Sequence, residues 1–238
     1  AGYTPSTLIL DAPFVIDQGP GLPKWRPANY TKKFYGPSTM RLGIEKSRNL
    51  MTVRLAQTIG MDRITQYAKR LGISDRFPET LSMALGAGET TLMRLTTAYA
   101  MLVNGGKRIT PSLIDRIQDR HGRTVMRHDK RTCTGCRLKS WTGEAAPRIA
   151  DIREQVTDSG SAYQVVAMLK GVVDRGTGRR VAKVGKPLAG KTGTTNQERD
   201  TWFIGFSPDL AVGVFAGFDT PIPLGRRETG SSVAAPVF

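Results

Sequence analysis

The stretch Lys191-Thr192-Gly193-Thr194 carries the side chains best suited to acyl-transfer chemistry in this sequence. Two apolar runs, 201–207 and 210–218, follow it and are separated by a Ser-Pro-Asp turn, so the segment predicts a strand that leads into a hairpin. An extended peptide can pair with the edge of such a strand through its main chain. Gly193 has no side chain to block that approach, and the positive charge of Lys191 favours an anionic substrate.

The threonines of this stretch add hydrogen-bonding groups. We expect Thr192 and Thr194 to offer hydroxyls to a terminal carboxylate, and we include the adjacent Thr195 among the substrate-binding residues. We also expect that the N–H of Thr194 can face the oxyanion that develops during acyl transfer. Losing one such donor costs about 3–4 kcal/mol of transition-state stabilisation.

A second short motif, Ser47-Arg48-Asn49, opens a helical pattern that ends at Gly60. From this position Ser47 could pass a proton to a departing amine, while Asn49 holds the amide of the substrate or Lys191. The alternative for Ser47 is a helix N-cap. No serine in the sequence has a lysine three residues later, so a Ser-x-x-Lys nucleophile motif is absent.

The elements around these motifs predict an α+β fold with helices packed on an antiparallel sheet. Apolar residues recur at helical spacing in three further segments, which end near 72, 105 and 173. Residues 1–37 are rich in Pro and Gly and are expected to be extended and full of turns. Gly86-Ala87-Gly88 is interpreted as a turn, since a nucleotide-binding loop needs further residues that are missing here. Residues 107–150 are interpreted as an insertion, with a hairpin formed by 113–118 and 123–127.

Composition restricts the possible partners. The 238 residues include 35 Lys and Arg against 20 Asp and Glu, which gives a net charge of +15. The basic residues are scattered and aromatic residues make up only 7%, so nucleic-acid binding is not expected. A basic surface that works beside anionic lipid or cell-wall polymer is the preferred interpretation. No apolar run is long enough to span a membrane. Both ends of the sequence suggest a fragment or a trimmed domain.

Cys133 and Cys136 are the only cysteines, and three outcomes stay open for them. A disulfide that closes a small loop is preferred. A zinc site that also uses His121 and His128 is the first alternative, although its spacing does not match a standard zinc finger. Free thiols are the third. In each case the pair belongs to the insertion and not to the acyl-transfer site, for which we expect no metal and no cofactor.

The sequence as a whole resembles the transpeptidase domain of class A, bifunctional penicillin-binding proteins. Ser47-Arg48-Asn49 and Lys191-Thr192-Gly193 match the second and third motifs of that family. The resemblance extends over nearly the whole chain and includes residues 11–14, 25–30, 36–41, 84–89, 98–100, 104–106, 171–173, 175–177, 190–196 and 217–219.

The resemblance implies a penicillin-binding protein/β-lactamase-like fold that is incomplete at both ends, with 1–238 as a single transpeptidase domain. It implies a serine-type D-Ala-D-Ala transpeptidase that cross-links peptidoglycan stem peptides and binds β-lactam antibiotics. Its Ser-x-x-Lys motif would lie just before residue 1, with a glycosyltransferase domain and a membrane anchor further upstream. The parent protein would then work in the periplasm, on the outer face of the bacterial inner membrane. We therefore expect that this chain alone does not form the acyl-enzyme.

Three alternatives to the transpeptidase remain. A D,D-carboxypeptidase or a β-lactamase-like hydrolase shares the acylation half of the reaction and uses water as the acceptor. A non-catalytic penicillin-recognition domain on the same fold would be consistent with the missing nucleophile.

Overall fold

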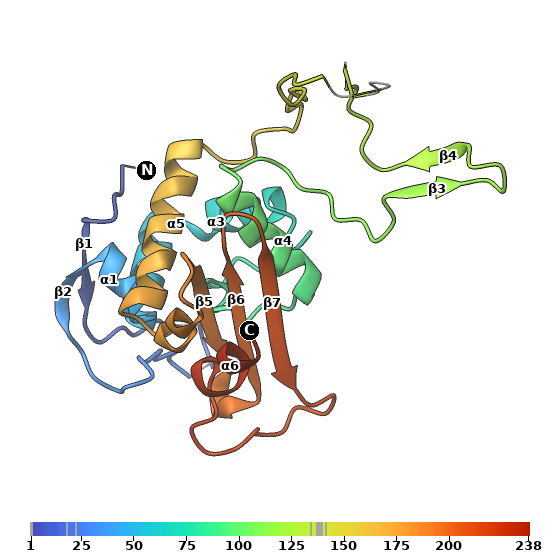
Figure 1. Cartoon of the computed structure of the whole chain (residues 1–238). Helices are drawn as coiled ribbons and strands as arrows, with labels where there is room; N and C mark the ends of the chain where they lie inside the picture. Colours follow the sequence, from blue (N-terminus) through green and yellow to red (C-terminus); the bar gives the residue numbers. More distant parts are fainter. Residues whose placement is uncertain (1, 18, 22, 134, 137–139, 141) are drawn as a thin grey trace.

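The computed structural model describes residues 2–17, 19–21, 23–133, 135–136, 140 and 142–238. Its centre is an antiparallel sheet of three strands, β5 (Ala189–Thr194), β6 (Asp200–Phe206) and β7 (Ala211–Gly217). β6 lies in the middle, and β5 and β7 form the two edges (Figure 1). In the register of β5 with β6, Lys191 pairs with Ile204 and Gly193 pairs with Trp202. The predicted strand followed by a hairpin is confirmed.

Two helices, α4 (Leu92–Val103) and α5 (Ser159–Asp174), cover one face of this sheet (Figure 1). Leu169 and Val172 of α5 pack against Phe206 of β6. Because side chains alternate along a strand, Phe203 of the same strand points to the opposite face. A π-helix, η4 (Gly230–Ala234), and the short α6 (Ala235–Val237) cover it there. Phe203 is fully buried, and its replacement by alanine would cost about 3–5 kcal/mol.

Helix α5 begins one turn earlier than its apolar pattern predicts. The Asp158 carboxylate accepts a hydrogen bond from the Ser161 N–H at 2.7 Å, which satisfies a free donor at the helix start. After α5, a 3-10 helix, η2 (Arg179–Val184), precedes β5. No helical turn was expected from the sequence between the end of α5 and β5.

Two helices frame the Ser-x-Asn motif. Helix α1 (Met40–Glu45) starts at Thr39, whose hydroxyl accepts from the Leu42 N–H, and α2 (Asn49–Ile59) follows it. The apolar face of α2 packs against Phe14 in the N-terminal segment. Ser47 lies between the two helices with φ of 53°, in the left-handed region. The N-cap position of α2 is Arg48, so the interpretation of Ser47 as a helix cap is wrong.

The N-terminal segment contains a short ladder that the sequence did not predict. β1 (Leu8–Asp11) pairs with β2 (Gly36–Thr39) in antiparallel register. The connecting residues carry a buried hydrogen bond, in which Asn29 Nδ2 donates to both carboxylate oxygens of Asp11 at 2.8 and 3.0 Å. This bond fixes an otherwise extended segment against α2, because the Leu50 N–H donates to Asn29 Oδ1.

The remaining helices agree with the periodic pattern. α3 (Met61–Arg70) follows Gly60, and a 3-10 helix, η1 (Leu81–Leu85), ends at Gly86 with φ of 87°. The turn predicted at 86–88 is therefore confirmed. A last 3-10 turn, η3 (Asn196–Glu198), joins β5 to β6. Of the helices in the described part of the chain, none has both the length and the apolar composition that crossing a membrane requires.

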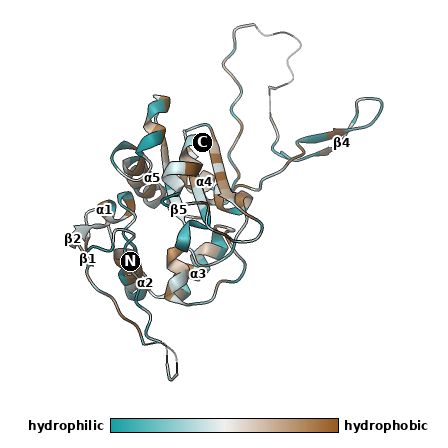
Figure 2. Ribbon diagram, turned by 90° about the horizontal axis from the view of Figure 1, so that it is seen from below, coloured by the Kyte–Doolittle hydropathy of each residue, from teal (hydrophilic) through white to brown (hydrophobic). Residues whose placement is uncertain are grey.

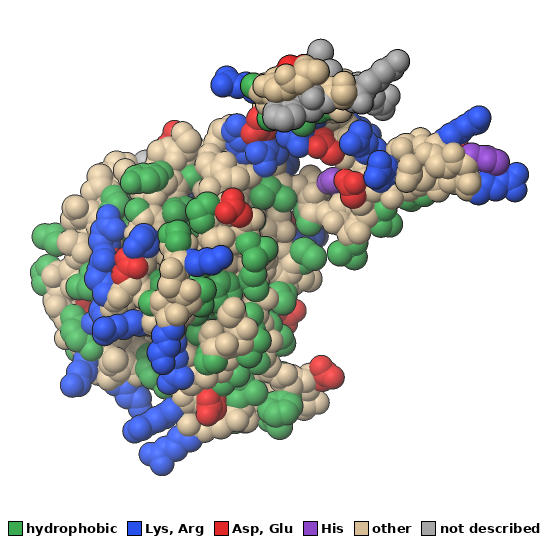
Figure 3. Space-filling model, viewed as in Figure 1, with side chains coloured by type: hydrophobic (Ala, Val, Ile, Leu, Met, Phe, Trp, Pro, Cys, Tyr) green, Lys and Arg blue, Asp and Glu red, His purple; other side chains and the backbone are tan. Residues whose placement is uncertain are grey.

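A hairpin of β3 (Arg116–Gln118) and β4 (Thr124–Arg127) stands clear of the body (Figures 1 and 2). Figure 3 shows Lys, Arg and His side chains at its tip and apolar side chains along its lower side. All residues of its two strands are exposed. The hairpin is confirmed, whereas the division of the chain into one domain with an insertion at 107–150 stays a prediction.

The loop after the hairpin contains the two cysteines. Cys133 and Cys136 form a disulfide, as preferred from the sequence. Because the bond uses both sulfur atoms, the zinc and free-thiol alternatives are wrong. Among the residues that the structure describes, no three His, Cys, Asp or Glu side chains gather as a metal site would require.

Candidate active site

Ser47 and Lys191 come from distant parts of the sequence and meet at one point. Lys191 Nζ donates to Ser47 Oγ at 2.8 Å and to the Thr192 carbonyl oxygen at 3.0 Å. Along β5, Lys191 shares a face with Ala189, which packs on α5. The ammonium group therefore lies where the α1–α2 connection meets the sheet. This is the contact that brings the second and third sequence motifs together.

The surroundings of Lys191 change its acid–base behaviour. Burial lowers the pKa of Lys191 to about 8, because removal from water disfavours the charged form. In the described part of the chain, no carboxylate lies within ion-pair distance of this lysine. The site thus holds a cation that an anionic ligand would stabilise and that can exchange a proton close to neutral pH.

Two glycines shape the strand beside this lysine. A Cβ on Gly193 would lie 3.1 Å from the Cβ of Trp202, its partner on β6. A Cβ on Gly230 would lie 2.5 Å from the Gly193 carbonyl oxygen, so only glycine lets η4 rest directly on β5. The outer edge of β5 pairs with no other described strand. The strand is therefore supported from behind and free along one edge, as the addition of an extended peptide requires.

The threonine hydroxyls make contacts within the protein. Thr192 Oγ1 lies 2.7 Å from Thr177 Oγ1, just after α5. Thr194 Oγ1 accepts from the Gly230 N–H at 3.0 Å, which leaves its own proton available for donation. Thr195 closes the loop to β6, since its Oγ1 accepts from the Asp200 N–H at 2.8 Å. Their roles toward a substrate stay predictions.

Asn49 is not brought to Lys191. Its side-chain amide donates to the Ala28 carbonyl oxygen at 2.9 Å, so it contacts the N-terminal segment. The neighbouring Arg48 lies over the ring of Tyr35, with 3.2 Å from Cζ to the ring centroid. A contact of Asn49 with the amide of a substrate stays a prediction.

Sequence reasoning missed the residues that join these pieces. Thr177 contacts Thr192, and the buried Glu45, two residues before Ser47, forms an ion pair with the half-exposed Arg175. Residues 175–177 were noted in the sequence only as part of the family pattern. No periodicity or spacing marks an ion pair whose members are 130 positions apart.

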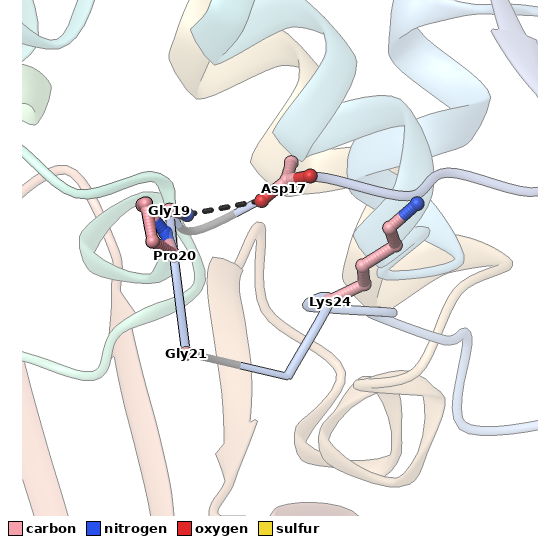
Figure 4. Close-up of a pocket in the computed structure, with 5 residues that line it drawn as sticks. All are labelled: Asp17, Gly19, Pro20, Gly21 and Lys24. Atoms are coloured by element: carbon pink, nitrogen blue, oxygen red, sulfur yellow. Dashed lines mark hydrogen bonds between the residues drawn. The ribbon is translucent and has the colours of Figure 1, made fainter.

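A surface pocket lies elsewhere, in the loop between Ile16 and Trp25, and is lined by Asp17, Gly19, Pro20, Gly21 and Lys24 (Figure 4). Figure 4 shows one hydrogen bond among them, from the Gly19 N–H to the Asp17 carboxylate. None of the motif residues lines it. The open edge of β5, and not this pocket, is the candidate active site.

Comparison with known proteins agrees with this fold and these motifs. The family model described as "Penicillin binding protein transpeptidase domain" matches residues 2–238. Penicillin-binding protein 1A of Rickettsia bellii is 49% identical over the whole chain, which spans 30% of that relative. Penicillin-binding protein 1A of Neisseria meningitidis is 38% identical, again over the whole chain, which spans 28% of it.

Solved structures show the same architecture. Penicillin-binding protein 1A from Haemophilus influenzae has a TM-score of 0.82 and 28% identity, and the alignment covers 97% of this chain and 38% of that one. PonA1 from Mycobacterium tuberculosis, in a complex with penicillin V, has a TM-score of 0.77 and 18% identity, over 99% of this chain and 62% of that one.

These matches show the class of protein: the chain has the α+β fold of the penicillin-binding proteins. More narrowly, it belongs to the penicillin-binding protein transpeptidase domain family, and its curated relatives named above are 1A proteins. The resemblance inferred from the sequence is confirmed. The chain spans less than a third of the length of those relatives.

Proposed function

We propose that this chain is the D,D-transpeptidase domain of a longer peptidoglycan synthase and that it binds β-lactams at the edge of β5. The observation that carries the proposal is the contact of the half-buried Lys191 with Ser47 beside that open edge. A cation that has no carboxylate partner among the described residues suits both a stem peptide that ends in D-Ala-D-Ala and the carboxylate of a penicillin. Membership of the transpeptidase family supports the same function.

The proposed reaction has two halves. A serine oxygen attacks the carbonyl carbon between the two D-alanines, the C–N bond breaks, and the terminal D-Ala leaves with a proton on its amine. An amine of a second stem peptide then attacks the ester, the C–O bond breaks, and the serine regains its proton. Ser47, hydrogen-bonded to Lys191, is placed to deliver the proton to the departing D-Ala. Thr192, Gly193 and Thr194 hold the peptide along the strand.

We propose that the nucleophile of this reaction lies outside these 238 residues, because no serine in them has a lysine three positions later. We place it on a Ser-x-x-Lys segment elsewhere in the whole protein. The proposed partners are that segment, the stem peptides, β-lactams and a membrane, which the whole protein would reach through an anchor outside this chain. The periplasmic side of the inner membrane is the proposed location, which would make the protein an antibiotic target.

A hydrolase is the second candidate. A D,D-carboxypeptidase or β-lactamase-like enzyme would share the acylation step and differ only in the acceptor. Both enzymes would hold the acylating peptide along the edge of β5, so membership of the transpeptidase family is what favours the transpeptidase. A non-catalytic penicillin-recognition domain would bind penicillin without a covalent bond.

The test uses intact-mass measurement after incubation with penicillin. The isolated chain and the whole protein are treated separately, and the Ser47→Ala variant of the whole protein serves as the comparison. We expect a stoichiometric adduct on the whole protein, none on the chain, and slower labelling of the variant. An adduct on the isolated chain would show that the nucleophile has been misplaced. Binding without any adduct on the whole protein would favour the non-catalytic alternative.

A further inference from the structure

A buried carboxylate lies two residues before Ser47. Glu45 ends helix α1, and its side chain is 2% exposed. Its two oxygens accept from the guanidinium of Arg175, at 2.9 Å from Nε and 2.5 Å from Nη2. Such a two-pronged bond fixes the direction of both side chains as well as their distance. Figure 1 shows α1 lying beside the end of α5, where Arg175 follows.

Main-chain contacts strengthen the same junction. The Thr177 N–H donates to the Glu45 carbonyl oxygen at 3.1 Å. In the reverse direction, Lys46 Nζ donates to the Arg175 carbonyl oxygen at 2.6 Å. A Cβ on Gly171 would collide with the Glu45 carboxylate, and one on Gly176 would collide with the Glu45 carbonyl oxygen. The lack of side chains at Gly171 and Gly176 thus leaves the space that Glu45 occupies at the end of α5.

These contacts close a ring around the candidate site. From Glu45 the ring runs to Thr177, whose hydroxyl meets Thr192 on β5. The next residue along β5 is Lys191, which donates to Ser47. Ser47 is two residues from Glu45 in the sequence, which closes the ring. Each link of the ring is therefore either a hydrogen bond or a stretch of one or two residues along the backbone. The ring ties the α1–α2 connection to the strand at two separate points.

The backbone of Ser47 needs such support. Its φ of 53° is unfavourable for a residue other than glycine, and strained conformations persist only where the surroundings hold them. If the hold on residue 45 is released, Ser47 can relax and its hydroxyl moves away from Lys191. Besides stabilising the fold in general, the ion pair would therefore help to hold the backbone of Ser47 in this conformation.

We propose that Glu45 and Arg175 form a positioning pair that holds the Ser47 hydroxyl on Lys191, and so sets the rate of acylation. This inference rests on the proposed function of the site. Neither residue touches the reacting atoms in this role, since both act through Ser47.

The test compares variants of the whole protein by the second-order rate of penicillin acylation and by the thermal midpoint. Arg175→Gln leaves the buried Glu45 carboxylate without its cation and is expected to lower the midpoint, whereas Glu45→Gln leaves only the half-exposed Arg175 unpaired and is expected to lower it less. In the double variant Glu45→Gln/Arg175→Gln no charge is left unpaired, so its midpoint should return toward that of the parent. We expect its acylation to stay about 10- to 100-fold slower than that of the parent, since small misplacements cost rates of this order.

The matched control is Lys170→Gln/Asp174→Asn, which removes an exposed ion pair from the same end of α5. It should acylate at the parent rate. If the double variant recovers both its midpoint and its acylation rate, the pair is structural only and the inference falls. Ser47→Ala separates the two proposals. If Ser47→Ala is slow while the double variant is fast, only the positioning role is lost. If Ser47→Ala acylates at the parent rate, the role of Ser47 in the proposed function is lost as well.

Discussion

Lys191 and Ser47 are 144 positions apart in the sequence, and Nζ of the lysine lies 2.8 Å from Oγ of the serine. The lysine is half-buried and has no carboxylate partner within the described residues, so the fold holds a charge that it does not neutralise. Such an arrangement lowers stability in return for affinity toward an anion. It also makes the stability of the chain depend on pH, and the direction of that dependence follows from the lowered pKa of Lys191.

Replacement of Lys191 by methionine should stabilise the chain most below pH 8. The pKa of Lys191 falls from the ordinary 10.5 to about 8 on folding, so the unfolded state holds more protons between those values. Stability of the parent therefore rises with pH across this window. The advantage of Lys191→Met, up to about 3 kcal/mol below pH 8, should shrink toward pH 10.5. Urea unfolding at several pH values measures it, with the exposed Lys186→Met as control. An advantage independent of pH would contradict the burial of the charge.

Replacement of Gly230 by alanine should destabilise the chain by about 1–3 kcal/mol. The added Cβ would lie 2.5 Å from the Gly193 carbonyl oxygen, so η4 or β5 must shift. Thermal unfolding gives the stability, and penicillin acylation of the whole protein should slow because the strand moves. Val237→Ala, in the same terminal segment but 72% exposed, is the control and should stay within about 0.5 kcal/mol of the parent. An unchanged midpoint for Gly230→Ala would mean that the close approach is absent in solution.

The Thr177 and Thr192 hydroxyls should show a coupling of about 0.5–1.5 kcal/mol in a double-mutant cycle. They lie 2.7 Å apart, so either single change to valine leaves the other hydroxyl without its partner. The double change should cost less than the sum of the two single changes. Denaturant unfolding of the four proteins gives the coupling. The exposed pair Thr80 and Ser82, with hydroxyl oxygens 3.0 Å apart, is the control and should show almost none. Strict additivity for Thr177 and Thr192 would remove one link of the ring described above.

Removal of the disulfide should leave the body of the chain intact. Cys133 and Cys136 close a very short loop in a segment that stands away from the sheet, and such a bond is worth at most about 2 kcal/mol. We expect Cys133→Ser/Cys136→Ser to keep the parent midpoint and the parent acylation rate. Alkylation before and after reduction, followed by mass measurement, counts the thiols. Alkylation of both sulfurs without reduction would disprove the disulfide under those conditions.

The sequence predicted those parts of the fold that local chemistry determines. The periodicity of Leu50 and Val53, with Gly60 at its end, predicted α2, while the Ser-Pro-Asp turn predicted the β6–β7 hairpin. The ladder of β1 with β2 was missed because Gly36-Pro37-Ser38-Thr39 has little strand propensity. The ladder forms because contacts with neighbouring parts of the fold fix the course of the N-terminal segment.

The site divides in the same way. Short motifs pointed to Ser47 and Lys191, because each motif is contiguous in the sequence. Glu45 and Arg175 were missed because their ion pair exists only after α1 has packed on α5. Asn49 was expected on the substrate or on Lys191, and it contacts Ala28, whose position depends on the fold of the N-terminal segment.

The two edges of the sheet differ in a way that affects how the isolated chain behaves in a test tube. β5 carries a lysine and two glycines, whereas β7 has seven uncharged residues, Ala-Val-Gly-Val-Phe-Ala-Gly, and its Phe215 is 43% exposed. Among the described strands nothing pairs with the outer side of β7. An uncharged, apolar edge is a template on which further strands add and chains aggregate. The isolated chain should therefore self-associate as its concentration rises, and dilute solutions are the ones in which its monomer can be studied.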